Sequence, residues 1–296
     1  MRLVPGRTAV PYRQTEGTMA LDDARVALFR EHPPAWWGWP WRLPTPLTIT
    51  ELIAAGSLDP RVAGLLWVAL ERRASLLVAA GPNGAGKTVL LSALLAFLPP
   101  HVQRVHLRGM AETFDFLAHA DPANTYLLCN ELSDHLPIYL WGRPARRLFE
   151  LLPQGFGLGA TLHADSVEEV LAVLRAPPLA IPAALLAQVA LVAVLAVRRQ
   201  GAGLQRRLAT LHCLDYTAGA LVARPLAVWD QNRDTYHYEA EAHLGPLARR
   251  LGLAPGQLAQ RAAARARFLA ALVARGTLAP DGVRAALAAY RDRDAP

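Results

Sequence analysis

The stretch SLLVAAGPNGAGKTVLLSALLAF, residues 75–97, decides the fold class. It opens with a short apolar run suited to a buried strand, and the residues from Lys87 onward have the apolar spacing of a helix. Between them GPNGAGKT, residues 81–88, matches the pattern G-x-x-x-x-G-K-[ST] in the strand–loop–helix setting that this motif requires. The sequence therefore predicts a phosphate-binding loop at the carboxyl end of a strand.

The residues of this loop are of the types that a nucleoside triphosphate needs. Glycines let backbone N–H groups close around phosphate oxygens, and the following helix directs its positive end toward them. We expect the Lys87 ammonium to neutralise the β- and γ-phosphates and the Thr88 hydroxyl to bind Mg²⁺. With ATP and Mg²⁺ as ligands, the predicted nucleotide-binding residues are Gly81, Pro82, Asn83, Gly84, Ala85, Gly86, Lys87 and Thr88.

Composition agrees with a globular protein that has a real core. The chain has 296 residues, of which 53% are hydrophobic, and a formal net charge of +7. Lys87 is its only lysine, and a compact ammonium is not interchangeable with a guanidinium in a small site. No basic run with interleaved aromatic residues is present, so we predict no specific nucleic-acid partner. Cys129 and Cys213 lie far apart in apolar segments, which predicts reduced core residues.

Predicted strands alternate with helices along the middle of the chain, which favours an α/β fold with a mostly parallel sheet. The strands are expected at 75–80, 104–108, 125–131, 158–163, 189–197, 206–216, 220–230 and 235–240, and helices from about 243 to 291 close the chain. We divide the sequence into an amino-terminal arm or linker over 1–46, a P-loop ATPase core over 47–215, and strands with a carboxy-terminal helical region over 216–296.

Residues 176–197 contain no charge, and by length alone they could span a membrane. Three prolines interrupt the start of this stretch and Gln188 divides it, so we predict a short helix followed by a strand buried on both faces. Residues 1–18 lack the apolar centre of a secretory signal, which makes a cytoplasmic protein the expectation. A helix is expected over Leu21–Glu31, and four tryptophans follow it: Trp36, Trp37, Trp39 and Trp41.

Two polar residues follow later strands and complete a candidate catalytic site. Glu131 ends the run TYLLCNE, and His163 ends LGATLH. Because the carboxyl ends of parallel strands share one edge of a sheet, both side chains should face the same nucleotide as the phosphate loop. We expect Glu131 to organise Mg²⁺ together with Thr88 and to position the attacking water, and His163 to contact the γ-phosphate. Asn130 stands where many P-loop enzymes carry an aspartate.

The order of these elements resembles the secretion-motor ATPases of type II and type IV secretion, type IV pili and archaeal flagella. The resemblance rests on residues 46–88, on DPANTYLLCNELSD (121–134), on ATLHADSVEEVLAVL (160–174), and on a tail over 228–276 that is similar to the archaeal branch. It implies a RecA-like P-loop NTPase followed by a small helical region. It also implies a hexameric ring that uses ATP to power pilus assembly or protein secretion, docked on a membrane platform protein at the inner face of the cell membrane.

The chain departs from the pattern of this family at several positions. The family carries an acidic box with arginines between the P-loop and the Walker B segment, and here that stretch reads RVHLRGMAETFDF, residues 104–116. Glu112 is the acid nearest to register and is our third catalytic candidate, with Arg104 or Arg108 replacing the lost arginines. Only about 46 residues stand where the family has a large amino-terminal domain.

Two alternatives to an active motor remain open. A nucleotide-binding, non-catalytic assembly subunit of such a machine agrees with the altered acidic box. An ABC-type transporter ATPase shares the form of the phosphate loop, but the segment FLAHADPANTY, residues 116–126, lacks the signature that this class needs before Walker B.

Overall fold

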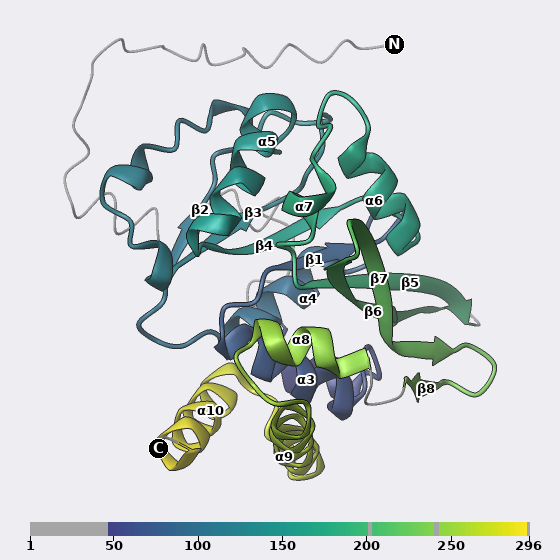
Figure 1. Cartoon of the computed structure of the whole chain (residues 1–296). Helices are drawn as coiled ribbons and strands as arrows, with labels where there is room; N and C mark the ends of the chain where they lie inside the picture. Colours follow the sequence, from purple (N-terminus) through teal and green to yellow (C-terminus); the bar gives the residue numbers. More distant parts are fainter. Residues whose placement is uncertain (1–46, 201–202, 240–242, 295–296) are drawn as a thin grey trace, which may run out of the picture.

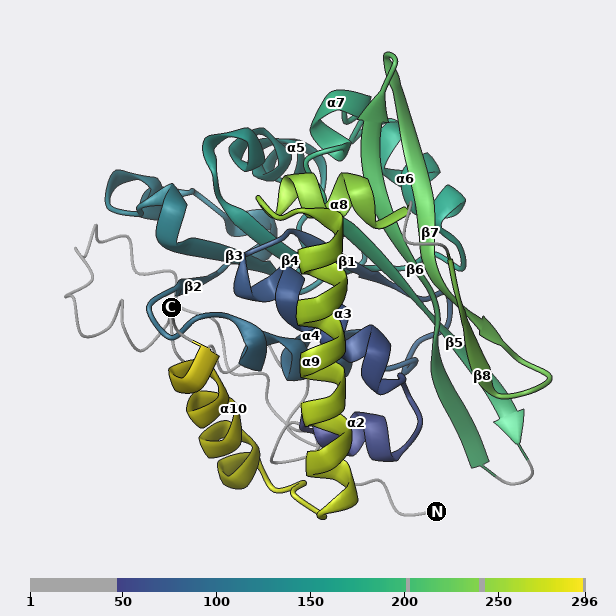
Figure 2. The same ribbon diagram turned by 60° about the horizontal axis from the view of Figure 1, so that its bottom comes forward.

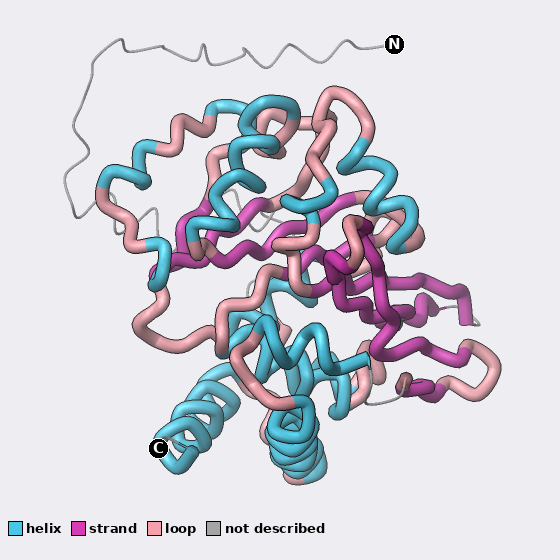
Figure 3. Tube along the Cα trace, in the orientation of Figure 1, coloured by secondary structure: helices cyan, strands magenta, loops and turns pink. Residues whose placement is uncertain are grey.

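The computed structural model describes residues 47–200, 203–239 and 243–294 (Figure 1). The helix predicted over 21–31 and the tryptophan-rich arm lie outside these residues. A single sheet runs through the described part of the chain, with helices on both sides of it, as the alternating pattern predicts. Figure 3 shows this layer of strands between helices.

Within the described residues, eight strands form the sheet in the order β2-β3-β4-β1-β5-β6-β7-β8. The neighbouring strands β2, β3, β4, β1 and β5 pair in parallel. From β5 onward the sheet continues through β6, β7 and β8 as an antiparallel meander. The mostly parallel α/β sheet is therefore confirmed. The strands are β1 (Leu76–Ala79), β2 (Gln103–His106), β3 (Thr125–Cys129), β4 (Gly157–Leu162), β5 (Leu191–Gln200), β6 (Gly203–Thr217), β7 (Ala220–Asp230) and β8 (Thr235–Tyr238).

The helices separate the core into two layers. One buried cluster lies between the sheet and the helices α2, α3, α4, α8, α9 and α10, and the other lies beneath α5, α6 and α7. These helices are α2 (Ile49–Ala54), α3 (Pro60–Glu71), α4 (Lys87–Leu94), α5 (Gly142–Leu151), α6 (Val167–Arg175), α7 (Ala183–Leu186), α8 (Leu244–Arg250), α9 (Pro255–Ala274) and α10 (Pro280–Asp294). Short 3₁₀ turns fill much of the segment between β2 and β3.

The central strands are buried on both faces, which explains their continuous apolar sequence. Every residue of β1, β3 and β4 is buried. The uncharged stretch 176–197 forms α7 and the first part of β5, as predicted, rather than one long helix. Among the described residues no helix combines the length and the apolar character that a membrane span needs.

The long carboxy-terminal helix α9 packs along α3, the helix that leads into β1 (Figure 2). Gly64 permits a close crossing, because a Cβ at this position would lie 2.4 Å from the Ala262 carbonyl oxygen of α9. At the same crossing the buried Arg265 side chain donates a hydrogen bond of 2.7 Å to Glu71 and lies over the Trp67 ring. The boundary expected at 215/216 falls inside β6, and the sheet continues through it.

Candidate functional site

The phosphate loop joins β1 to α4 in a conformation that glycine makes possible. Gly84 and Gly86 have φ angles of 75° and 98°, in the left-handed region that other residues rarely adopt. Gly86 is the N-cap of α4, and as a glycine it has no side chain that could cap the first turn of that helix. The backbone N–H groups of this turn and the helix dipole therefore favour an anion at the carboxyl end of β1.

The strand order brings three predicted residues together. Strand β4 lies between β1 and β3, so His163 at the end of β4 falls between the loop that carries Lys87 and the segment that carries Glu131. The Lys87 Nζ atom is 3.0 Å from His163 Nε2 and 3.9 Å from a Glu131 carboxylate oxygen. The Lys87 and Glu131 side chains are only 8% and 10% exposed, and such shielding strengthens the attraction between their charges.

His163 also touches the backbone of the phosphate loop. Its Nδ1 atom lies 2.8 Å from the Gly81 carbonyl oxygen, and Nε2 lies 3.4 Å from the second Glu131 oxygen. A carbonyl oxygen can only accept and an ammonium can only donate. The contact with Gly81 therefore requires a proton on Nδ1, while the Lys87 Nζ atom lies close to both ring nitrogens, 3.0 Å from Nε2 and 3.2 Å from Nδ1.

Asp165, which the sequence reasoning missed, holds the first residue of the loop. The Gly81 N–H donates a hydrogen bond of 2.9 Å to Asp165 Oδ1. A Cβ on Gly81 would lie 2.1 Å from the same oxygen, so this contact requires glycine. The Asp165 N–H in turn donates to Glu169 at 2.6 Å. The segment that begins at His163 thus contacts the Gly81 backbone through two side chains, the His163 imidazole and the Asp165 carboxylate.

The backbone on both sides of Glu131 is fixed by neighbouring segments. The Leu140 N–H donates to the Glu131 carbonyl oxygen at 2.9 Å, and the Leu132 N–H donates to the Thr161 carbonyl oxygen at 2.8 Å. The Thr161 hydroxyl donates to the Asn130 carbonyl oxygen at 2.6 Å. These bonds tie the end of β3 to β4, and they hold the Glu131 carboxylate beside Lys87.

The acidic residues of the described segments do not form a metal site by themselves. No group of three or more histidine, cysteine, aspartate or glutamate side chains in these segments has the geometry to hold a metal ion. Mg²⁺ held through the Thr88 hydroxyl and Glu131, as the sequence predicts, would therefore need phosphate oxygens and water to complete its coordination. This fits a metal that arrives with a nucleotide.

Glu112 is engaged within its own loop. Its carboxylate accepts hydrogen bonds from the Arg108 N–H at 2.8 Å and from the Phe114 N–H at 2.6 Å, one on each oxygen. The side chain is 2% exposed. This carboxylate therefore shapes the loop after β2, and because it is so buried, a role as a base for water would require the loop to open.

The two arginines expected to replace those of the acidic box point to other partners. Arg104 donates a hydrogen bond of 2.8 Å to the Leu95 carbonyl oxygen, beyond the end of α4, and burial lowers the pKa of its guanidinium. Arg108 forms ion pairs within its own loop, at 3.3 Å to Asp115 and 3.6 Å to Glu112.

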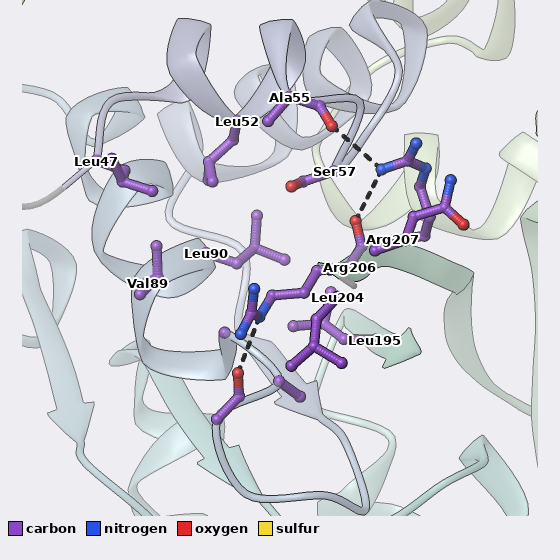
Figure 4. Close-up of a pocket in the computed structure, with 15 residues that line it drawn as sticks. Leu47, Leu52, Ala55, Ser57, Val89, Leu90, Leu195, Leu204, Arg206 and Arg207 are labelled. Carbon is purple, nitrogen blue, oxygen red and sulfur yellow. Dashed lines mark hydrogen bonds between the residues drawn. The ribbon is translucent and has the colours of Figure 1, made fainter. Parts of the chain in front are cut away.

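Arg206 of β6 reaches the phosphate loop instead. Its Nε–H donates a hydrogen bond of 3.0 Å to the Gly84 carbonyl oxygen. Arg206 and the loop glycines line a cavity of about 680 Å³, together with apolar side chains that include Leu52, Val89 and Leu204. Figure 4 shows the Arg206 side chain extended across this cavity toward the loop. Since 122 residues separate Arg206 from Gly84, no local pattern could have identified this contact.

The neighbouring Arg207 fixes this part of β6. It makes two hydrogen bonds of 2.8 Å to Asp234 and a third, of 3.1 Å, to the Ala55 carbonyl oxygen at the end of α2. Asp234 also accepts from the Trp229 indole at 2.8 Å. The hydrogen bonds from Arg207, followed by that from Trp229, lower the pKa of Asp234 to about 2. One wall of the cavity is therefore held by charged hydrogen bonds.

Comparison with known proteins gives distant matches. No protein-family model matches the chain. The chain is 25% identical to the uncharacterized protein MJ1287 of Methanocaldococcus jannaschii, over 74% of this chain and 89% of that protein. It is also 25% identical to the uncharacterized protein MJ0900 of the same organism, over 78% of this chain but only 46% of that protein. Identity reaches 32% with the cytochrome c biogenesis ATP-binding export protein CcmA of Ruegeria pomeroyi, over 41% of this chain and 56% of that protein.

Among solved structures, similarity is found to the VirB11 ATPase of the Brucella suis type IV secretion system, crystallised with sulphate. The two share 19% identity with a TM-score of 0.38, over 67% of this chain and 64% of that one. The Legionella pneumophila ATPase DotB shares 12% identity with a TM-score of 0.36, over 83% of this chain and 66% of that one. In each case the chain spans somewhat less than two thirds of the neighbour's length.

Proposed function

We propose that the chain binds ATP and Mg²⁺ at the phosphate loop and hydrolyses ATP. The observation that carries this proposal is the convergence of Lys87, Glu131 and His163 beside the loop. Lys87 would exchange its contact with His163 for phosphate oxygens, and Glu131 would orient water for attack. Mg²⁺, when bound, would offset the charge of the phosphate oxygens, with Thr88 and Glu131 on its protein side.

The cavity beside the loop suits the rest of a nucleotide. Its volume of about 680 Å³ lies in the range of small-molecule sites. Apolar side chains on two sides offer surfaces for a flat base, and the Arg206 guanidinium can stack on such a base as well as contact the loop. In this arrangement the phosphates lie at the loop and the base lies over Leu52 and Val89. The eight loop residues, 81–88, would then bind the phosphates.

We further propose that hydrolysis drives a motor of the secretion and pilus type. Support comes from the sequence resemblance, which spans the P-loop entry, the Glu131 segment, the His163 segment and the tail. On this proposal the core is RecA-like, the chain assembles into a hexameric ring, and the ring docks on a membrane platform protein at the inner face of the cell membrane. The name of CcmA, an ATP-binding export protein, supports nucleotide binding for the matched part.

A second candidate is a nucleotide-binding subunit that holds such a machine together without turnover. The bonds of Glu112 favour it, because both carboxylate oxygens are used by backbone N–H groups of its loop. Arg104 and Arg108 favour it too, since their hydrogen bonds and ion pairs are with other partners.

Calorimetric titration with ATP and ADP, run beside light scattering, tests the proposal. Lys87→Ala removes the charge that faces phosphate, and Lys87→Arg introduces a larger, planar cation, so both variants should lose most of their ATP affinity. Arg199→Ala, an exposed change on β5, is the control and should bind ATP like the parent chain. Unchanged affinity in both Lys87 variants would contradict the nucleotide site, and a monomeric mass in saturating ATP would contradict the ring.

A further inference from the structure

A second cavity, of about 540 Å³, lies at the amino-terminal ends of β1 and β4, opposite the ends that face the phosphate loop. Five segments meet there: the turn between α3 and β1, the turn before β4, the turn between α7 and β5, the end of β6, and α8. Arginines project from two of these segments. Arg72 and Arg73 come from the first turn, and Arg249 and Arg250 come from α8.

The charge of this cavity is strongly unbalanced. Its lining contains those four guanidinium groups and a single carboxylate, that of Asp215. Asp215 also pairs with Arg224, at 3.6 Å, so little of its charge remains to offset the four arginines. Arg249 lies 3.9 Å from Asp215, and its side chain is 70% exposed. The lining as a whole therefore attracts anions.

The arginines are held in place with donors left for a ligand. Arg72 donates a hydrogen bond of 2.8 Å to the Leu251 carbonyl oxygen, and Arg73 donates one of 2.9 Å to that of Gly155. Arg250 donates to the carbonyl oxygen of Ala187. Each of these three uses one terminal nitrogen for its main-chain contacts within the described residues. A guanidinium has five N–H donors in a planar fork, so most of them remain available.

We propose that this cavity binds an acidic peptide segment of a partner protein. Guanidinium forks match carboxylates through paired hydrogen bonds, and arginine is enriched among residues that carry binding energy at protein interfaces. Leu152, Phe156 and Leu251 add apolar surface to the lining, which suits side chains that alternate with carboxylates.

Features of the lining favour a peptide over a nucleic acid. Phe156, the aromatic residue of the lining, is 4% exposed and offers little face for base stacking. The N–H of Gly155, the lining glycine, is donated to the Leu152 carbonyl oxygen, so it does not contribute to a cradle of backbone amides for phosphate.

The position of the cavity leaves the nucleotide site clear. Strand β1 runs from Ser75 at this cavity to the phosphate loop, and β4 runs from Phe156 to His163. The two sites lie at opposite ends of the same strands, so a peptide and a nucleotide can be bound at once. Peptide binding can therefore be tested independently of ATP hydrolysis.

Fluorescence anisotropy with a short labelled peptide of alternating glutamate and leucine tests the proposal. We expect saturable binding that weakens as salt is added, and no binding of a matched lysine–leucine peptide. Arg249→Glu should weaken binding by roughly tenfold or more, because it replaces an attraction by a repulsion. Arg267→Glu makes the same charge change at an exposed site on α9, and it should leave binding unchanged.

A photocrosslinking amino acid at position 188, an exposed residue of the lining, should label the acidic peptide at the cavity. The proposal is overturned if the parent chain does not bind the peptide, or if Arg249→Glu and Arg267→Glu weaken binding equally. Binding of phosphatidylglycerol vesicles with the same dependence on Arg249, and no binding of the peptide, would instead identify an anionic lipid site and overturn it.

Discussion

Replacing His163 by alanine separates a structural role of this imidazole from a role in hydrolysis. In the structure the ring donates to the Gly81 carbonyl oxygen at 2.8 Å and contacts the Lys87 ammonium at 3.0 Å. A neutral hydrogen bond contributes about 0.5–1.5 kcal/mol, and one to a charged group about 1.5–3 kcal/mol. Water can replace part of both, because the side chain is 27% exposed.

We therefore expect His163→Ala to lower the free energy of unfolding by about 2 kcal/mol. For a domain of this size the melting temperature should fall by roughly 4–8 °C without nucleotide. His101→Ala is the control, since His101 is exposed in the turn before β2, and its effect should stay within about 0.5 kcal/mol. Thermal unfolding of the three proteins, followed by circular dichroism, gives these values.

The same variant should keep its ADP affinity nearly unchanged, because we expect His163 to contact the γ-phosphate, which ADP lacks. ATP hydrolysis should fall by roughly tenfold to a hundredfold if His163 contacts the γ-phosphate in the transition state. Equal melting temperatures of His163→Ala and His101→Ala would contradict the structural role of the imidazole. A loss of ADP affinity as large as the loss of hydrolysis would contradict its role at the γ-phosphate.

Three further changes test other parts of the structure. Arg206→Ala should weaken ATP and ADP binding by the same factor, roughly fivefold for a lost cation–π contact of about 1 kcal/mol, and a loss confined to ATP would argue against a contact with the base. Arg265→Ala should lower the free energy of unfolding by about 3 kcal/mol, because it leaves Glu71 without its buried partner; a urea titration that shows no difference from Arg267→Ala would contradict this. Because the pKa of Asp234 is lowered to about 2, its bonds to Arg207 should stabilise the fold fully above about pH 4 and progressively less as the pH falls toward 2. The difference in free energy of unfolding between the parent chain and Asp234→Asn, measured by urea titration at each pH, should therefore shrink over that range. A difference that is the same at pH 2 and pH 5 would contradict the lowered pKa of Asp234.

The parts of the fold that the sequence predicted are those encoded over short distances. Apolar runs located the buried strands, and the spacing of glycines with Lys87 located the loop, because strand, loop and helix are consecutive in the chain. The ends of β3 and β4 could be identified in the same way. Their convergence followed from the rule that parallel strands end at a common edge.

The contacts that the sequence did not predict depend on long-range packing. The position of β4 between β1 and β3 places His163 against Lys87, and alternation of strands and helices does not determine that order. Arg206 reaches Gly84 only because the meander after β5 turns back over the loop. Register along the sequence indicates Glu112, but the turn around it, which uses both carboxylate oxygens, is formed by backbone geometry that residue type does not reveal.

The most direct test of the central claim is steady-state ATP turnover with Mg²⁺ by the parent chain and by Glu131→Gln, with ATP binding measured on the same samples. The amide keeps the size of the side chain but cannot act as a base for water, so turnover should fall by roughly a hundredfold or more while ATP affinity stays within about threefold of the parent. A parent chain that binds ATP without turnover would contradict the motor and favour the non-catalytic subunit. Equal turnover in both proteins would show that Glu131 does not position the attacking water.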